Sequence, residues 1–116
     1  MVRRANERQV EIGEHRWGAD GFITIRRLIN NPEELNGKGR LFSHTTVEPH
    51  SGIGYHVHNG DSEIYYILSG KAEYNDNGTM TTLEAGDVAF TPDGCGHGIN
   101  NPTDEPVEMI ALILYS

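Results

Sequence analysis

The sequence predicts an all-β fold, and three observations support this prediction. Apolar residues show almost no helical spacing, whereas short runs rich in β-branched and aromatic residues recur along the chain. Turn-forming residues separate these runs, and the 116 residues include 14 glycines and 5 prolines. Asn77-Gly78 is a strong hairpin marker because both residues tolerate positive φ better than most. Short strands at such spacing are typical of a sandwich or a barrel.

The N-terminal part is predicted to contain an arm, one strand and one helical turn. Residues 1–20 begin with a dozen mostly polar and charged residues, so we expect an arm rather than part of the core. Residues 22–29 form a β-rich run that Asn30-Asn31-Pro32 closes. Residues 32–35 start with a proline and two glutamates, which favours a single helical turn.

From residue 41 onward the chain alternates between β-rich runs and turn signals. Each run is short, and every turn between two runs contains glycine, proline, asparagine or aspartate, which are the usual turn residues. The predicted strands are 41–47, 53–58, 63–69, 71–74, 80–83, 87–91, 98–100 and 107–115.

Length and charge limit the number of domains and the classes of partner. We expect one domain, residues 1–116, because either half of the chain would be too small to bury a stable core. The chain carries 17 Asp and Glu against 9 Lys and Arg, a net charge of −8. Such a surface repels phosphate groups, so neither a nucleic acid nor an anionic membrane is expected as a partner.

Cysteine content and apolar runs bear on the compartment. The N-terminus has basic residues but no apolar run after them, so it does not read as a secretory signal. The longest apolar run, residues 109–115, is too short to cross a bilayer. The single cysteine, Cys95, excludes an intramolecular disulfide. We therefore expect a cytoplasmic protein.

Four residues have the chemistry and spacing of a metal site: His56, His58, Glu63 and His97. His56 and His58 are two apart on a predicted strand, so both side chains point to the same face. Glu63 starts the next strand, and a hairpin can bring it beside the two histidines. His97 lies far along the chain, so only the tertiary fold can bring it to the other three residues. Three imidazoles and one carboxylate suit a divalent ion such as Fe, Mn, Ni, Cu or Zn. The alternative is a histidine cluster satisfied by hydrogen bonds without a metal.

The residues around these four resemble the two motifs of the cupin superfamily. The second motif is matched at every position, in the order Gly86-x5-Pro92-x-Gly94-x2-His97-x3-Asn101. The first motif is matched from its first histidine onward, in the order His56-x-His58-x4-Glu63-x6-Gly70. The position of the motif's opening glycine holds His50 in this chain. This departure affects a turn before the strand and none of the candidate metal ligands.

The resemblance covers residues 41–115 and implies the fold and the site of small bacterial cupins. The implied fold is a double-stranded β-helix, a jelly-roll-like barrel, with residues 22–28 as an extra N-terminal strand. By the same resemblance, His56, His58, Glu63 and His97 bind one divalent metal ion inside the barrel. Four protein ligands on a six-coordinate ion leave two positions for water, dioxygen or a chelating substrate.

Two classes of function are compatible with such a site. The first is a metal-dependent enzyme that acts on a small carboxylate or enol-like substrate. Small cupins of this kind resemble dioxygenases, oxalate-type decarboxylases, lyases and isomerases. The alternative is a non-catalytic module that binds a metal or a small molecule. In both classes we expect the partner to be a small, anionic ligand.

Several residues near the site are candidates for the pocket wall. Alternation from Glu63 and from His97 places every second residue on the metal-facing side, although core packing explains the same residues. The candidates are His44, Tyr65, Ile67, Phe90, Cys95, Ile99 and Met109. His44 is a candidate hydrogen-bond partner of a metal ligand or a candidate general base, and the alternative is an ordinary histidine on the surface or in the core. Cys95 is interpreted as a wall residue rather than a ligand.

Two further features leave alternatives open. Arg26 and Arg27 face opposite ways on a strand, so one of them can point into the barrel mouth and bind a carboxylate; solvated strand ends are the alternative. The final strand is apolar on both faces, with Ile110, Leu112 and Leu114 on one of them. We expect this face to pack against a second copy in a homodimer, and coverage by the N-terminal segment is the alternative.

Overall fold

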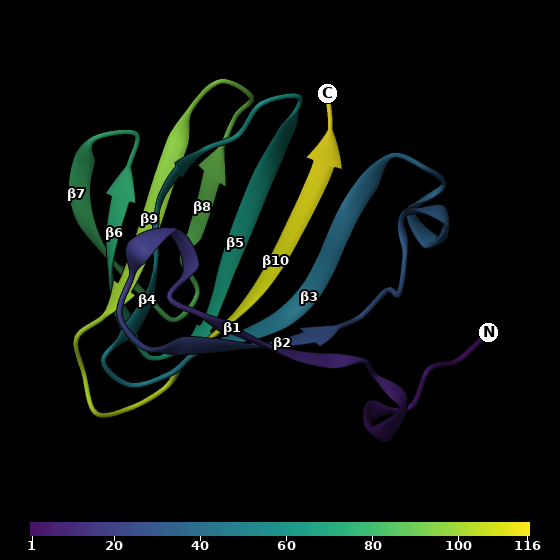
Figure 1. Ribbon diagram of the computed structural model, residues 1–116, viewed down its shortest axis with the longest axis horizontal. Coiled ribbons are helices and arrows are strands. Elements are labelled where there is room, and N and C mark those ends of the chain that lie inside the picture. The colour runs from purple at the N-terminus through teal and green to yellow at the C-terminus, as the bar shows by residue number, and fades with distance from the viewer.

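The computed structural model describes residues 1–116 and contains two antiparallel sheets that face each other (Figure 1). The larger sheet has six strands in the order β1-β2-β3-β10-β5-β8, and the smaller has four in the order β4-β9-β6-β7. The strands are β1 Val10–Glu14, β2 Phe22–Arg27, β3 Gly39–Val47, β4 Ser51–Val57, β5 Asp61–Ser69, β6 Lys71–Asp76, β7 Thr79–Glu84, β8 Val88–Thr91, β9 Gly96–Asn101 and β10 Val107–Tyr115. The all-β prediction is confirmed, and the arrangement is a double-stranded β-helix.

Helical structure is limited to three short 3-10 segments, η1 Ala5–Glu7, η2 Arg16–Gly18 and η3 Pro32–Leu35. The helical turn predicted for residues 32–35 is therefore present as η3. None of these segments is long and apolar enough to span a membrane.

The Asn77-Gly78 marker forms the hairpin between β6 and β7. Both residues have positive φ, 49° and 100°, and the flanking Asp76 and Thr79 are register partners. A two-residue loop with positive φ at both positions matches the twist of the strands that it joins. The local sequence thus determines this register.

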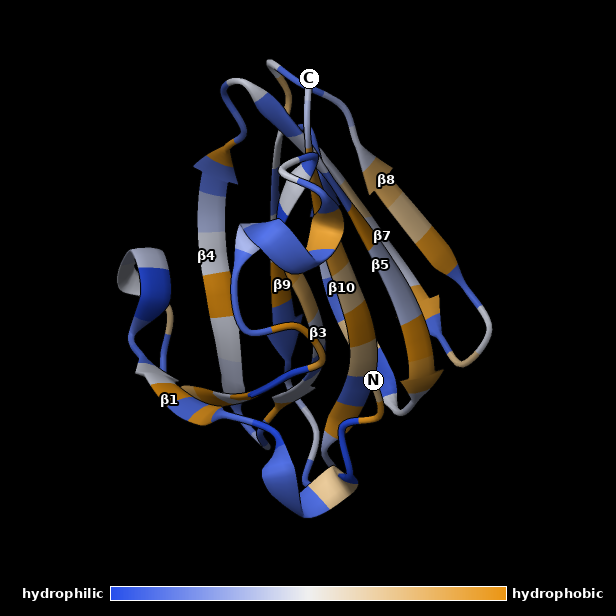
Figure 2. Cartoon of the chain, turned by 90° about the vertical axis from the view of Figure 1, so that its right-hand side faces the viewer, coloured by the Kyte–Doolittle hydropathy of each residue, from blue (hydrophilic) through white to orange (hydrophobic).

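The core lies between the two sheets and follows the predicted alternation. Along β5, Tyr65 and Ile67 are buried, whereas Tyr66 and Leu68 are more than two-fifths exposed. The buried set comprises Ile23, Ile25, Val47, Ile53, Tyr65, Ile67, Ala72, Tyr74, Leu83, Ala89, Ile99, Val107, Met109 and Ala111. Apolar residues are concentrated on β5, β8 and β10 (Figure 2).

The N-terminal segment differs from the expected arm. Within residues 1–20, β1 pairs with β2 along its whole length, from Val10 opposite Arg26 to Glu14 opposite Phe22. The pattern did not predict this strand because its apolar side chains, Val10 and Ile12, are more than half exposed. Backbone hydrogen bonds to β2 hold β1 in the sheet, and these leave no signature in hydrophobic patterning.

Candidate metal centre

Strand pairing brings the four candidate ligands together from both sheets. His56 on β4 is the register partner of His97 on β9. His58 lies just beyond the end of β4, and Glu63 is on β5 of the opposite sheet. One donor atom from each residue lies within 4.8 Å of the other three. The fold therefore places His97 beside His56, His58 and Glu63, although it is far from them in the sequence.

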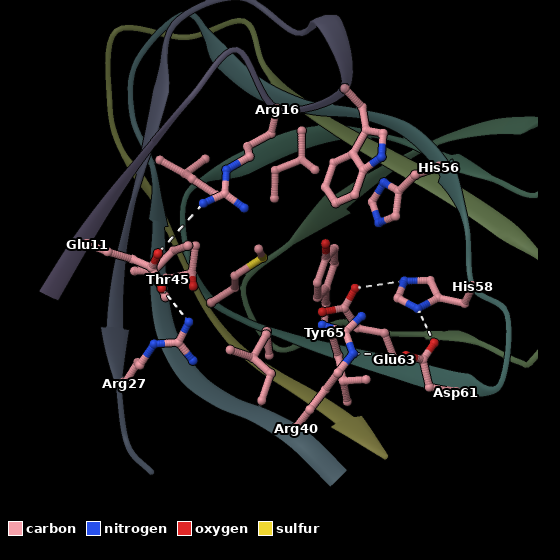
Figure 3. Close-up of a pocket in the computed structure, with 18 of the residues that line it drawn as sticks. Glu11, Arg16, Arg27, Arg40, Thr45, His56, His58, Asp61, Glu63 and Tyr65 are labelled. Atoms are coloured by element: carbon pink, nitrogen blue, oxygen red, sulfur yellow. Dashed lines mark hydrogen bonds and ion pairs between the residues drawn. The ribbon is translucent and has the colours of Figure 1, made fainter. Parts of the chain in front are cut away.

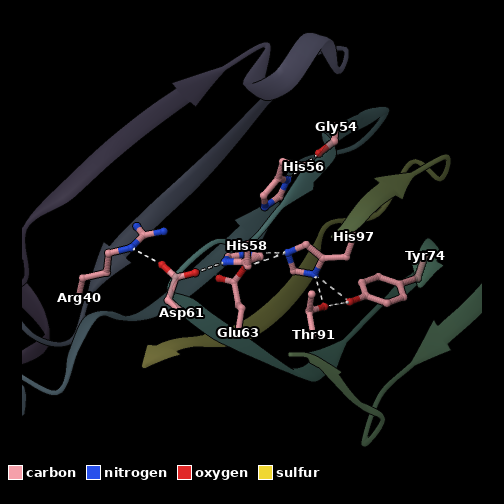
Figure 4. Close-up of polar contacts among 9 residues, drawn as sticks. All are labelled: Arg40, Gly54, His56, His58, Asp61, Glu63, Tyr74, Thr91 and His97. Carbon is pink, nitrogen blue, oxygen red and sulfur yellow. Dashed lines mark hydrogen bonds and ion pairs between the residues drawn. The ribbon is translucent and has the colours of Figure 1, made fainter. Parts of the chain in front are cut away.

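Three of the four donors form a tight triangle (Figure 4). Glu63 Oε1 is 3.0 Å from His97 Nε2 and 3.2 Å from His58 Nε2, and the two nitrogens are 3.1 Å apart. All three side chains are at most 5% exposed. Donor atoms this close, away from water, need a proton or a metal ion between them.

The far nitrogen of each imidazole has its own hydrogen-bond partner. His56 Nδ1 donates to the Gly54 carbonyl at 2.8 Å, and His58 Nδ1 donates to the Asp61 carboxylate at 2.7 Å. Both partners only accept, so Nδ1 carries a proton, and Nε2 of each ring faces the cluster, where its lone pair is free for a metal whenever the ring is neutral. His97 Nδ1 lies 2.8 Å from the Tyr74 hydroxyl and 2.9 Å from that of Thr91.

This donor set fits a transition-metal ion. Neighbouring ligands of a six-coordinate ion with bonds of about 2.1 Å are roughly 3.0 Å apart, which agrees with the 3.0 to 3.2 Å within the triangle. Three imidazoles and one carboxylate suit Fe, Mn, Ni, Cu or Zn better than Ca²⁺ or Mg²⁺. Hydrogen-bonded far nitrogens are what ligating histidines in metal sites have.

The protonation of these groups reflects their environment. Burial lowers the pKa of His56, and the neighbouring His97 lowers it further. The hydrogen bond to Glu63 raises the pKa of His58, with a smaller contribution from Asp61. Burial alone would raise the pKa of Glu63, but its hydrogen bonds to His58 and His97, together with the charges of these two histidines, outweigh burial, so the pKa is lowered. The metal-free cluster thus holds an ionised carboxylate that pairs with His58.

A cavity of about 340 Å³ opens beside the cluster and extends across the inner face of the larger sheet (Figure 3). Half of its 20 lining residues are hydrophobic. Trp17 on η2 stacks on the His56 ring with centroids 3.9 Å apart. The wall also includes Tyr65, which stacks on His97 at 4.9 Å.

The predicted wall residues divide into three groups. Tyr65 and Met109 line the cavity, whereas Ile67 and Ile99 are buried in the core outside its wall. His44 Nε2 lies 2.7 Å from Glu108 and away from the cavity. Cys95 and Phe90 also lie outside the wall: Cys95 is half-buried in the loop before β9, and Phe90 is 56% exposed. Phe90 points outward because it is the register partner of Ile64, on the outer side of β5.

Several wall residues come from segments that no motif or pattern in the sequence had singled out. Glu11, Arg16 and Trp17 belong to the expected arm, and Arg40 lies at the start of β3. Arg27 lines the cavity, which answers the choice that the sequence left open between Arg26 and Arg27. Arg26 donates to Thr46 at 2.7 Å instead.

Comparison with known protein families agrees with this architecture. The model of the cupin domain matches residues 43–113. The chain belongs to the cupin family. The match runs from β3 to β10 and includes all four residues of the cluster.

Two relatives and two solved structures place this cupin more closely. It is 37% identical over 114 residues to the oxalate-binding protein of Thermotoga maritima, covering 98% of this chain and 93% of that protein. It is 35% identical over 72 residues to the oxalate decarboxylase OxdC of Bacillus subtilis, covering 58% of this chain but 19% of that enzyme. A crystal structure from T. maritima described as a predicted oxalate decarboxylase superposes with a TM-score of 0.93, 36% identity and full coverage of both chains. The cupin domain of Schizosaccharomyces pombe Cnp3 shares the fold alone, with a TM-score of 0.72 and 15% identity over 93% of this chain and 70% of that one.

Proposed function

We propose that this cupin binds one divalent metal ion through His56, His58, Glu63 and His97 and acts on a small carboxylate that chelates the ion. The observation that carries the proposal is the convergence of three imidazoles and one carboxylate at the side of a cavity. When bound, the ion supplies Lewis acidity at the coordination positions that the protein leaves open. The relatives named for oxalate binding and oxalate decarboxylation support a carboxylate as the ligand.

Tyr65 is the cavity residue best placed to assist the chemistry. Its ring is buried against His97, and burial raises the pKa of its hydroxyl well above 10, with the Glu63 charge adding to the effect. The phenol therefore keeps its proton and can donate a hydrogen bond to an oxygen of the bound carboxylate. This role suits a decarboxylase, lyase or isomerase as well as a dioxygenase.

A non-catalytic carboxylate-binding module is the second candidate. The two other carboxylates of the cavity wall are already engaged: Glu11 pairs with Arg27, and Asp61 bonds both Arg40 and His58. No acidic side chain of the wall is therefore free to transfer a proton. This observation favours capture of the ligand over its conversion, and only turnover distinguishes the two candidates.

Replacing Glu63 separates the enzyme from the binding module. Glu63→Gln removes the charge but keeps one acceptor oxygen, so the three imidazoles can still retain part of the metal. In an enzyme, wild type consumes a carboxylate that stabilises it in a thermal-shift screen, and the variant loses most of the turnover. In a binding module, the compound is recovered unaltered after long incubation with metal-loaded wild type, and the variant binds it at least as well.

We also propose that two copies of the chain pack through the outer face of the larger sheet. This face carries two apolar cross-strand rows, one with Leu112 opposite Ile64 and the other with Ile110 opposite Tyr66. The rows continue onto β8, where Phe90 and Val88 are more than half exposed. A contiguous apolar face of this kind is typical of protein interfaces.

A further inference from the structure

We infer that the cavity holds an elongated dicarboxylate, with one carboxylate at the metal centre and the other bound by Arg27 and Arg16. This inference rests on the proposed metal centre and names the substrate class of that site. It differs from oxalate, whose two carboxylates are bonded directly to each other.

Arg27 is built into the cavity wall by the alternation of β2. Ile23, Ile25 and Arg27 share the inner face of this strand and all line the cavity. Register partners connect Arg27 to Ser43, then to Ala111, and then to Tyr65 beside the cluster. Three strand spacings of about 4.8 Å place the Cα atoms of Arg27 and Tyr65 roughly 14 Å apart along the sheet. Arg27 and the metal ligands therefore lie at opposite sides of one cavity (Figure 3).

Arg16 reaches the same end of the cavity from η2. Its guanidinium packs on the backbone of Gly13, where a Cβ atom would lie 2.6 Å from Arg16 Nε. Its Nη2 is 3.8 Å from Glu11 Oε2, too far for a hydrogen bond, while Glu11 Oε1 accepts from Arg27. Two guanidiniums thus share one carboxylate, and most of their donors have no protein acceptor. A second carboxylate can use them in a bidentate contact.

The charge of the cavity favours a dianion. Its wall contains three arginines and three carboxylates: Arg16, Arg27, Arg40, Glu11, Asp61 and Glu63. These charges cancel, so a divalent ion bound by neutral imidazoles leaves an excess of two positive charges. A dicarboxylate neutralises this excess.

The surface between the two charged ends favours an apolar spacer. Met109, Ile25, Ile53 and Trp17 line the cavity as well and give its wall an apolar surface. The cavity of about 340 Å³ could hold roughly ten waters at about 30 Å³ each. That is more room than two directly bonded carboxylates fill, and an apolar wall rewards the burial of methylene groups rather than water.

A series of dicarboxylates tests this inference. Metal-loaded wild type is titrated by calorimetry with oxalate, malonate, succinate, glutarate and adipate, and with a monocarboxylate of matching length. We expect a longer dicarboxylate to bind more tightly than both oxalate and the monocarboxylate. Arg27→Gln should weaken the binding of that dicarboxylate by about ten-fold to a hundred-fold, the effect of one hydrogen bond to a charged group. It should leave the affinity for oxalate nearly unchanged.

Arg26→Gln is the matched control, because it removes the same charge from the neighbouring position, whose side chain bonds Thr46 instead of lining the cavity. Arg26→Gln should change neither the affinity for the longer dicarboxylate nor the affinity for oxalate. If Arg27→Gln does not fold, Arg16→Gln should give the same selective loss. Oxalate as the tightest ligand, or equal weakening of all ligands by both cavity variants, overturns the inference and leaves the metal centre intact. Wild type that takes up no metal overturns the proposed function and this inference together.

Discussion

Each histidine of the cluster has a hydrogen-bond partner of a different kind at its Nδ1 atom. Gly54 offers His56 a backbone carbonyl, Asp61 offers His58 a carboxylate, and Tyr74 offers His97 a hydroxyl. Such partners fix the orientation of a ligating imidazole and raise its basicity. The carboxylate has the strongest effect because it carries a full charge, so Asp61 is the most informative residue to replace.

Asp61→Asn should weaken metal binding by about ten-fold to a hundred-fold without removing a ligand. The amide cannot stabilise the His58 imidazole as the carboxylate does, and it also loses the ion pair to Arg40 at 3.0 Å. Competition with a chromophoric chelator measures the affinity. Asp104→Asn, a change at a side chain that is 92% exposed, should leave it unchanged. Equal affinities in all three proteins would contradict a supporting role for Asp61.

Metal uptake should fall as the pH falls, because an imidazole must lose its proton before it binds a metal. The hydrogen bond to Glu63, with Asp61, raises the pKa of His58 above the ordinary value of 6.5. A proton therefore competes with the metal at His58 already above pH 6.5. Burial lowers the pKa of His56, which stays neutral to a lower pH. Equilibrium dialysis between about pH 5 and 8 should show a decline that starts above 6.5; uptake independent of pH would contradict this.

At the residue scale, the sequence predicted the four clustered residues but not the rest of the cavity. His56, His58, Glu63 and His97 are identifiable because their types and spacing are unusual together. Trp17 is not, because its position over His56 depends on the path of a loop and not on a periodic pattern.

At the scale of elements, the connection from β1 to β2 packs over the candidate metal centre, where Trp17 stacks on His56. Its 3-10 segment η2 packs on β4 at Gly54, where a Cβ atom would lie 2.0 Å from the Trp17 carbonyl oxygen. His15 and Trp17 have positive φ, 48° and 49°, which lets the chain turn sharply over the cavity. Only glycine at position 54 permits this close approach.

Gly54→Ala should therefore move Trp17 away from His56. Trp17 is the single tryptophan of the chain, so its fluorescence reports its position directly. We expect a red-shifted emission and weaker quenching by a bound paramagnetic ion. Gly37→Ala is the control, since position 37 has positive φ but open space around it; it should lower stability and leave the spectrum unchanged. An unchanged spectrum in Gly54→Ala would contradict the packing described.

The elements themselves were predictable where a run of β-branched, aromatic and other apolar residues is bounded by turn residues. β5 and β10 are such runs, and they were predicted within two residues at each end. β9 is longer than predicted and begins at Gly96, so His97 lies on a strand. β1 was missed because its inner face presents Glu11 and Gly13 rather than apolar side chains.

At the scale of the whole molecule, the outer face of the larger sheet bears on assembly. If it forms the proposed interface, wild type should run as a dimer, at twice the 12.9 kDa of one chain. Leu112→Glu should give a monomer or a precipitate, because it buries a charge without a partner. Thr82→Glu, on the exposed β7 of the other sheet, should remain dimeric. Light scattering at tens of micromolar that shows a wild-type monomer would contradict the proposal.

Fold and family follow from the sequence because turns, alternation and two motifs agree with one another. The substrate does not, because the cavity wall combines residues from β1, η2, β2 and β3 that meet only in the folded barrel. Arg27 illustrates this limit: the sequence left open whether Arg26, Arg27 or neither points into the barrel, and only the folded position of β2 shows that Arg27 lines the cavity.

The metal content of the protein tests the central claim most directly. Untagged wild type, purified without chelators and without a metal-affinity column, is analysed for transition metals per chain, beside His56→Ala and the control His50→Ala. His50 is exposed and pairs with Asp104, away from the cluster. We predict close to one divalent ion per chain in wild type and in His50→Ala, and a strong loss in His56→Ala. Wild type that takes up no metal even when it is supplied, or equal content in all three proteins, would contradict the metal centre.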